Sequence, residues 1–514
     1  MKTKLFTILI ILSLLTGCSA TDNSHSKETL WLVTELTTAD SFNYQIEAAV
    51  EHFEAKNDGI AIQVDVLPTD TAEREIYLKQ LRTQIMSGNG PDIYLLPTGN
   101  TLTVNSGSAV GQLVTSEIEI QPLFPDLVQA MYSGIFADIS SMYDSDPGIV
   151  GLRQDIMDAG TIKNRRYVLP LRYTMPVMQS YNTTEANITE LVEQAVSSQD
   201  TMMAMGLEMP DNTSLLSKLF DYQKGELLIT QEEIAQYMRL YQQWYALSKS
   251  AWDTLITQRM NEIRIYLEDG VPDFPYDVLV YGNVNITRYS YNDVYAYGRY
   301  GYHWSLEGFP IYSDTLTGAL DQSAIGKVLD KSLISQPMRN TDGAVVAEVT
   351  YYGAIGSSCR EPGLAYDFLR MFLTEEYQWD MIRPRAPREN IDFFKLPAEV
   401  QVDGMIEDSW PVRTTGATAY LWDTLQYQNF HEPYNYENRH KALKSNDLNI
   451  TDSDLPILNI PIDEVRFPFY QPYEESLGYA LSLLNNEDGS PTDADIDTLA
   501  SEVVRYLWWH LAEG

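Results

Sequence analysis

Hydrophobic and polar residues follow two different periods in the first part of the chain. Some stretches place apolar residues three and four positions apart, which is typical of helices, and others alternate or form short apolar runs, which is typical of strands. The predicted elements are, in order, a strand over 29–33, a helix from 42 to the Asp58-Gly59 pair, a strand over 60–66, a helix over 71–87 and a strand over 92–96. This alternation with short connections favours parallel strands joined by right-handed crossovers, so we expect an α/β fold.

Polar side chains follow the predicted strands. Glu35 and Thr37 come after the first strand, and Thr98 and Asn100 come after the third. In open parallel sheets, ligands bind beyond the carboxyl ends of the strands. We therefore predict these four side chains to be ligand-binding residues.

The N-terminal segment has the pattern of a secretory signal. Lys2 and Lys4 precede an apolar run over 5–15, which is too short to span a bilayer. The run ends in Leu15-Thr16-Gly17-Cys18, which resembles the lipobox of bacterial lipoproteins. The resemblance implies that residues 1–17 are removed, that Cys18 carries the lipid (palmitate among its acyl chains), and that 18–28 form a tether at the outer leaflet of the cytoplasmic membrane. The alternative is a secreted protein in which Cys18 has no role.

Composition excludes several classes of partner. The 514 residues include 72 Asp+Glu against 35 Lys+Arg, a net charge of −37, which argues against binding to nucleic acid or to an anionic membrane surface. We therefore expect membrane contact through the lipid anchor only. The two cysteines cannot form a disulfide scaffold, and we expect Cys359 to be a small buried side chain. Asp138, Asp144 and Asp146 lack Ca²⁺-loop spacing, so we interpret them as caps and turns and predict no metal.

Several phrases are similar to one family. The segment 84–93 (QIMSGNGPDI) resembles a signature of family 1 extracellular solute-binding proteins, which serve ABC importers of sugars. We interpret Asp92 itself as a turn or strand-start residue. Further phrases follow in the order of that family, at 136–139, 166–170, 343–347, 352–355 and 365–374.

The resemblance implies a periplasmic-binding-protein-like fold of two α/β lobes with a central ligand cleft and several hinge crossings. We expect lobe 1 to comprise 29–147 and 310–383, and lobe 2 to comprise 148–309 and 384–514. The crossings would then lie near 146–151, 309–311 and 382–387, with the C-terminal helices on or beside lobe 2.

Aromatic residues are concentrated before the expected second crossing. The segment 281–304 holds eight Tyr and Trp residues, and the whole chain has 34 Tyr and 9 Trp. Sugar rings stack on such side chains while polar groups bind their hydroxyls. We predict Tyr302, Trp304, Trp410 and Arg413 as further ligand-binding residues. The alternative for any one of these tyrosines is a half-buried surface position.

No nucleophile elbow, P-loop, zinc-protease or dinucleotide-binding motif occurs, although the paired carboxylates of a glycosidase need no fixed motif. The binding role that the resemblance implies breaks no bond, so we expect neither catalytic residues nor a cofactor. The resemblance implies a monomeric substrate-binding protein that captures a small solute by lobe closure and delivers it to ABC permease subunits. The abundance of Tyr and Trp in the chain favours a carbohydrate or oligosaccharide as the solute. Two alternatives stay open, namely a surface glycosidase and a lipoprotein that senses or adheres to carbohydrate.

Overall fold

The protein is described by a computed structural model. The described residues are 28–35, 42–68, 70–99, 102–105, 117–181, 186–201, 204, 209, 213, 215–268, 311–313, 333–380, 399–402, 410–415, 456–485 and 493–513. Cys18 lies outside them. Among the described residues, no helix combines the length and the apolar character needed to cross a membrane.

Seven strands form one mixed sheet. Strands β1 (Glu28–Thr34), β2 (Ile60–Val66) and β3 (Ile93–Pro97) are parallel, with β1 between the other two. β15 (Val346–Ile355) runs antiparallel between β3 and β8 (Val168–Thr174). β17 (Trp410–Pro411) pairs with β8, and β18 (Glu464–Arg466) pairs with β15. The predicted parallel α/β unit is thus confirmed, and three strands from much later in the chain, β15, β17 and β18, complete the sheet.

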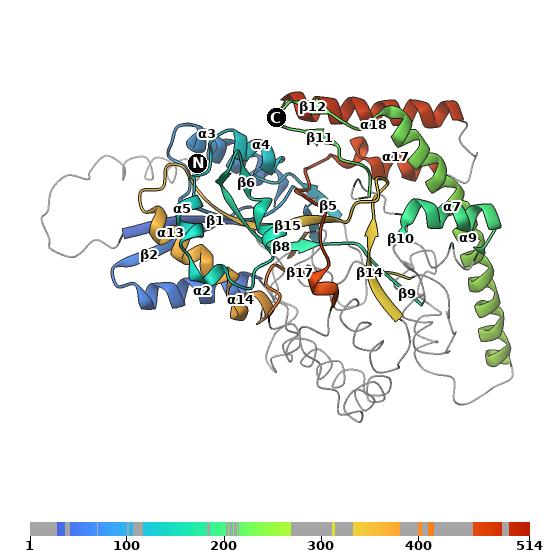
Figure 1. Ribbon diagram of the computed structural model, residues 1–514, viewed down its shortest axis with the longest axis horizontal. Coiled ribbons are helices and arrows are strands. Elements are labelled where there is room, and N and C mark those ends of the chain that lie inside the picture. The colour runs from blue at the N-terminus through green and yellow to red at the C-terminus, as the bar shows by residue number, and fades with distance from the viewer. Residues whose placement is uncertain are drawn as a thin grey trace, which may run out of the picture.

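Helices cover both faces of this sheet (Figure 1). α2 (Phe42–Lys56) and α13 (Pro362–Leu369) pack on one face, where the rings of Phe53 and Phe368 meet edge-on with centroids 5.5 Å apart. α3 (Thr71–Met86) and α4 (Leu127–Tyr132) pack on the other. We call these the α2 face and the α3 face. The alternation of side chains along each strand supplies both, because Leu32 and Leu95 belong to the first core and Val33 and Leu96 to the second.

A second body adjoins the sheet and lies at the right of Figure 1. Its core is formed by α7 (Ile188–Ser198), the described side chains of α9 (Gln231–Glu268), α17 (Leu477–Leu484) and α18 (Asp493–Glu513). A four-stranded sheet lies beside these helices in the order β10 (Ala186–Asn187), β14 (Leu333–Arg339), β9 (Val177–Tyr181) and β13 (Ile311–Ser313). We call the seven-stranded sheet with its helices the first body.

The remaining elements are short. A three-stranded sheet joins β4, β5 and β16, and two small hairpins join β6 to β7 and β11 to β12. The bounds of these and the other elements are β4 Leu102–Asn105, β5 Glu117–Ile120, α5 Ser140–Asp144, η1 Pro147–Ile149, α6 Gln154–Asp158, β6 Thr161–Ile162, β7 Arg165–Arg166, β11 Phe220–Asp221, β12 Glu226–Leu227, η3 Arg370–Leu373, α14 Glu375–Asp380, β16 Glu399–Val402, η6 Pro456–Asn459 and η7 Tyr473–Glu475.

The described chain passes between the two bodies three times. β8 leads into β9 through residues 175–176, β14 leads into β15 through 340–345, and β18 leads into α17 through 467–476. Two side chains fix these crossings to the same carbonyl of the second body, since Asn340 Nδ2 donates to Leu216 O at 3.3 Å and Arg466 Nη2 donates to it at 3.0 Å.

The crossings differ from those expected. Residues 152–174 belong to the first body, because β8 pairs with β15 along its length, so the turn at 146–151 is not a crossing. β13 pairs with β9 in the second body, so the return follows β14 rather than lying at 309–311. Trp410 and Leu458, which were expected in lobe 2, also belong to the first core. The third expected crossing, at 382–387, lies outside the described residues.

Asp126 joins the two bodies where they meet beside α4. Its Oδ1 accepts from Gln129 N at 3.0 Å and caps α4, while its Oδ2 accepts from Tyr222 OH at 2.8 Å and lies 2.9 Å from His510 Nε2. Tyr222 and His510 both belong to the second body. Burial, followed by the nearby Asp126 charge, raises the pKa of Tyr222 far above its ordinary value, so the phenol remains a donor.

Asp126→Ala should therefore be strongly destabilising. Removing the carboxylate leaves three partners of a buried network unsatisfied, and we expect urea unfolding to show a loss of about 3 kcal/mol. The matched control is Asp138→Ala, which removes an exposed cap that accepts from Ser140 N at 3.0 Å and should cost about 1 kcal/mol. Equal losses in the two variants would contradict a role for Asp126 between the bodies.

Candidate functional site

Polar side chains gather at one edge of the first sheet, where β1 and β3 end. β15 is antiparallel to β3 and pairs Tyr351 with Pro97, so its first residues lie at this same edge. Glu35 and Thr98 continue the alternation of Val33 and Leu96 and therefore lie toward the α3 face. On β15, Val349 and Tyr351 both face the α2 core, so Thr350 between them lies on the α3 side. In Figure 1, β1 begins at the left-hand side and runs toward the second body.

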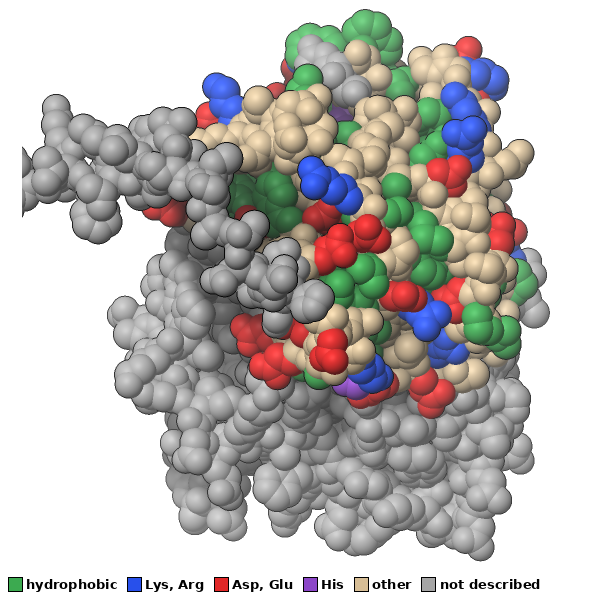
Figure 2. Space-filling view, turned by 90° about the vertical axis from the view of Figure 1, so that its left-hand side faces the viewer, with side chains coloured by type: hydrophobic (Ala, Val, Ile, Leu, Met, Phe, Trp, Pro, Cys, Tyr) green, Lys and Arg blue, Asp and Glu red, His purple; other side chains and the backbone are tan. Residues whose placement is uncertain are grey.

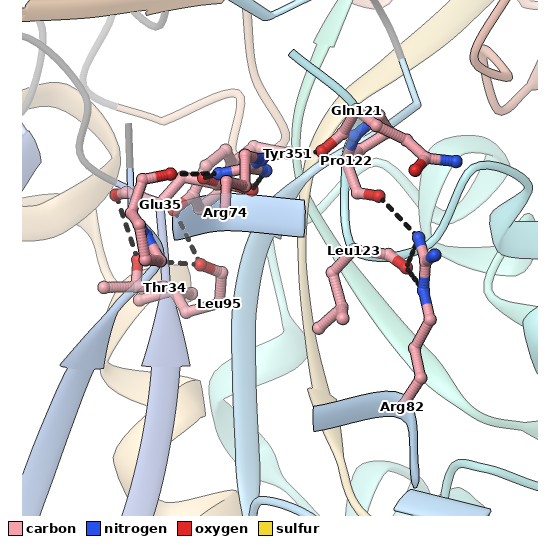
Figure 3. A network of polar contacts seen from close by, with 10 residues as sticks. Thr34, Glu35, Arg74, Arg82, Leu95, Gln121, Pro122, Leu123 and Tyr351 are labelled. Carbon is pink, nitrogen blue, oxygen red and sulfur yellow. Dashed lines mark hydrogen bonds and ion pairs between the residues drawn. The ribbon is translucent and has the colours of Figure 1, made fainter. Parts of the chain in front are cut away.

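A buried ion pair lies at the end of β1 (Figure 3). Arg74 Nη2 and Nη1 donate to the two oxygens of Glu35 at 2.6 and 2.9 Å, and the side chains are only 2% and 1% exposed. Asp70 starts α3 by accepting from the backbone N–H groups of Ala72 and Glu73, which places Arg74 in the first helical turn. Glu35, predicted as a ligand contact, thus has both carboxylate oxygens bound by Arg74.

Arg74 also holds the backbone of two loops. Its Nε donates to Gln121 O at 2.8 Å, and its Nη1 donates to Pro68 O at 3.1 Å. About two turns further along α3, Arg82 Nη2 donates to Leu123 O at 3.0 Å (Figure 3). The two arginines therefore fix the loop after β2 and the segment before α4 against the edge of the sheet.

Two hydroxyls close the space between β1, β3 and β15. Thr34 Oγ1 and Tyr351 OH each donate to Leu95 O at 2.9 Å (Figure 3). Burial raises the pKa of Tyr351 well above its ordinary value, so the phenol keeps its proton and its donor role. This part of the edge is internally satisfied.

The end of β3 is also bonded within the protein. Thr98, another predicted contact, is 1% exposed and donates its hydroxyl to Val349 O at 2.7 Å. Gly99 N donates to Pro468 O at 3.1 Å, on the third crossing. A Cβ at Gly99 would lie 2.5 Å from Pro125 O and 2.7 Å from Tyr470 N, so only glycine permits this close approach of backbones.

Thr350 and Glu348, on β15, carry side-chain oxygens that have no hydrogen-bond partner among the described residues. The sequence analysis did not predict either residue as a ligand contact. Thr350 Oγ1 is buried and has no hydrogen-bond partner among the described residues. Glu348 is partly exposed, and within the described structure no hydrogen bond to its carboxylate is recorded. Burial raises the pKa of Glu348, Arg466 opposes this shift, and Glu464 adds to it. A Glu and a Thr interrupting the apolar run 345–355 were the signal available in the sequence.

The other predicted ligand contacts do not join this edge in the described structure. Trp410 is 0% exposed and packs on Tyr173 in the α2-face core, with ring centroids 6.0 Å apart. Arg413 donates to the carbonyls of Gly148, Val150 and Leu373 at 2.7–2.9 Å, and burial lowers its pKa. These placements give Trp410 and Arg413 a framework role and present no free face of the Trp410 ring to a ligand. The predicted contacts outside the described residues are Thr37, Asn100, Tyr302 and Trp304.

Asp138 and Asp146, which the sequence predicted to be cap or turn residues, each accept a hydrogen bond from a nearby backbone N–H. Asp138 accepts from Ser140 N at 3.0 Å just before the start of α5, and Asp146 caps the short helix η1 by accepting from Gly148 N at 2.7 Å. Asp92 accepts from Trp31 N at 2.8 Å, which confirms it as a strand-start residue. Within the described ranges, no group of three or more His, Cys, Asp or Glu side chains could hold a metal ion. Cys359 is half-buried, and burial raises its pKa to about 12, so it is a thiol at neutral pH.

The surface of the first body carries both signs of charge. Figure 2 shows acidic and basic side chains interspersed over the described part of one side of the molecule. Such a mixture provides no extended positive field for a phosphate backbone.

Arg74→Met should destabilise the protein by about 3–5 kcal/mol, because it leaves the Glu35 carboxylate buried without its partner. The double variant Arg74→Met/Glu35→Met should recover much of this loss, since no uncompensated charge remains. The control is Arg165→Met, which removes an exposed pair with an N–O distance of 3.7 Å to Asp138 and should cost under about 1 kcal/mol. Chemical denaturation gives the free energy of unfolding of the wild type and the three variants. A double variant that is less stable than Arg74→Met would contradict the ion-pair explanation.

Glu348→Gln should stabilise the ligand-free protein at neutral pH. A carboxyl whose pKa is raised by folding holds its proton more tightly in the folded state, so its ionisation lowers the stability as pH rises above about 4.5. The variant lacks this loss, and its advantage in Tm should be present at pH 7 and vanish at pH below about 4. Glu193→Gln, at an exposed position of α7, is the control and should show no such trend. A lower Tm for Glu348→Gln at pH 7 would contradict the prediction.

Comparisons with known proteins give matches in structure only. No protein-family model matches the chain, and neither does any curated protein. A family 1 extracellular solute-binding protein from Alicyclobacillus acidocaldarius subsp. acidocaldarius DSM 446 is similar in structure at 13% identity and a TM-score of 0.45, covering 93% of this chain and 98% of that chain.

Two further solved structures are similar to this chain. An ABC substrate-binding protein from Listeria monocytogenes in complex with cycloalternan has 12% identity and a TM-score of 0.41, covering 93% of this chain and 99% of its own. The cyclic alpha-maltosyl-1,6-maltose binding protein from Arthrobacter globiformis has 12% identity and a TM-score of 0.43, covering 93% and 98%. All three structures are of solute-binding proteins. Because their TM-scores lie below 0.5, we transfer neither site residues nor a ligand from them.

Proposed function

We propose that the protein is a solute-binding protein that holds a small solute between its two bodies. The observation that carries this proposal is the threefold passage of the chain between the bodies, at 175–176, 340–345 and 467–476. Several connections between two bodies permit hinge closure around a ligand, and sites between domains at the carboxyl ends of strands are common. Ligand binding would favour the closed form through its higher affinity for that form.

The proposed solute is an uncharged carbohydrate or oligosaccharide. Support comes from the uncommitted oxygens of Glu348 and Thr350 at the sheet edge, which suit solutes that offer many hydroxyl donors. The abundance of Tyr and Trp in the chain adds flat surfaces on which sugar rings stack. Binding leaves the solute unchanged, so the proposed role requires no catalytic residue.

The proposed setting is the outer leaflet of a bacterial cytoplasmic membrane. Support comes from the sequence alone, in which an apolar run ends at Cys18 within a lipobox-like phrase. Acyl chains on Cys18 would hold the protein beside ABC permease subunits that receive the solute from the closed form. The proposed protein is monomeric and needs no cofactor.

Thermal unfolding against a panel of neutral sugars tests the proposed function. We expect at least one of maltotriose, mannotriose and cellotriose to raise the Tm, because a ligand at about 100 times its Kd adds about 2.7 kcal/mol to the stability of the folded state. Chromatography of the same mixtures after incubation should recover the sugar intact. A shortened sugar would indicate a glycosidase instead, and an unchanged Tm with every sugar would contradict the proposal.

A further inference from the structure

Thr350 is an exception among the threonines of the sheet edge. The hydroxyls of Thr34 and Thr98 donate to strand carbonyls at 2.9 and 2.7 Å, whereas Thr350 Oγ1 has no partner among the described residues. Thr350 as a whole is only 4% exposed. Burying a hydroxyl without a hydrogen bond is unfavourable, and native proteins satisfy nearly all such groups. An unsatisfied buried hydroxyl at this edge is therefore available to a ligand.

Glu348 lies two residues before Thr350 on the same strand and on the same α3 side. The residue as a whole is only partly buried, and its carboxylate accepts no hydrogen bond from any described residue. Arg466, whose charge opposes the rise in the pKa of Glu348, donates to Glu464 at 2.8 Å and to Leu216 O at 3.0 Å. Glu348 thus keeps its acceptor capacity beside the second and third crossings, where the two bodies meet.

We propose that Glu348 and Thr350 form the floor of the solute site and bind hydroxyl groups of an uncharged, polyhydroxylated solute. This inference rests on the proposed function and names residues for it. Glu348 and Glu464 both lie near one arginine, Arg466, so at pH values above the pKa of Glu348 the floor carries net negative charge and disfavours anionic solutes such as uronic acids. Solute hydroxyls donate to the Glu348 carboxylate and to Thr350 Oγ1, which can also donate in return.

Paired variants separate binding from stability. Thr350→Val keeps the shape of the side chain and removes only the unpaired hydroxyl, so the ligand-free Tm should stay the same or rise. Affinity for whichever of maltotriose, mannotriose and cellotriose binds the wild type best should fall about tenfold by calorimetry. Glu348→Gln should lower the same affinity by tenfold or more, because a charged acceptor forms the stronger hydrogen bond.

Two controls make the outcome specific. Thr98→Val removes a hydroxyl that is bonded to Val349 O and should lower the ligand-free Tm, in contrast to Thr350→Val. Thr83→Val, at an exposed position of α3, should change neither affinity nor Tm appreciably. Trigalacturonate should bind the wild type at least tenfold more weakly than the best neutral trisaccharide.

The possible failures are distinguishable. If the wild type binds a neutral sugar and both Thr350→Val and Glu348→Gln bind it equally well, the floor lies elsewhere and the proposed function stands. Trigalacturonate binding as tightly as the neutral sugar would overturn the charge argument. If the wild type binds none of the sugars, the proposed function fails, and this inference fails with it.

Discussion

The ion pair between Glu35 and Arg74 is the constraint on which the edge of the sheet depends. A carboxylate at the end of β1 and a guanidinium in the first turn of α3 are each almost fully buried, so neither is tolerated without the other. The same guanidinium binds the carbonyls of Pro68 and Gln121. One side chain thereby sets the positions of β1, the loop after β2 and the segment before α4. The geometry of any solute contact at this edge follows from that arrangement.

In contrast to these hydrogen-bonded residues, two side chains of β15 destabilise the folded state. Thr350 has a buried hydroxyl with no described partner, and Glu348 carries a carboxylate whose ionisation burial disfavours. Natural proteins retain such local conflicts mainly where function requires them. The contrast with Thr98, a similar side chain at the same edge that is fully bonded, indicates that the conflict is a property of position rather than of residue type.

The local pattern of the sequence predicts the first elements closely and the long-range arrangement poorly. The strand over 60–66 and the helix from 71 coincide with β2 and α3, because period and capping residues act within a few positions. The turn at 146–151 was mistaken for a crossing, since Pro147 and Gly148 mark a break but the pairing of β8 with β15 decides the direction of the chain. Likewise, the strand-end argument located Glu35 and Thr98, but partners distant in sequence bind both side chains. Thr350 was overlooked within an apolar run.

The central position of β15 has a consequence for biosynthesis. This strand lies between β8 and β3, yet the described elements of the second body from β9 to β14 precede it in the chain. The sheet of the first body therefore cannot close until residue 355 has been made, and β3 and β8 wait with open edges until then. Such non-local pairing slows folding. Strand edges that stay unpaired during synthesis expose backbone N–H and C=O groups, which raises the risk of misassembly until β15 has been added.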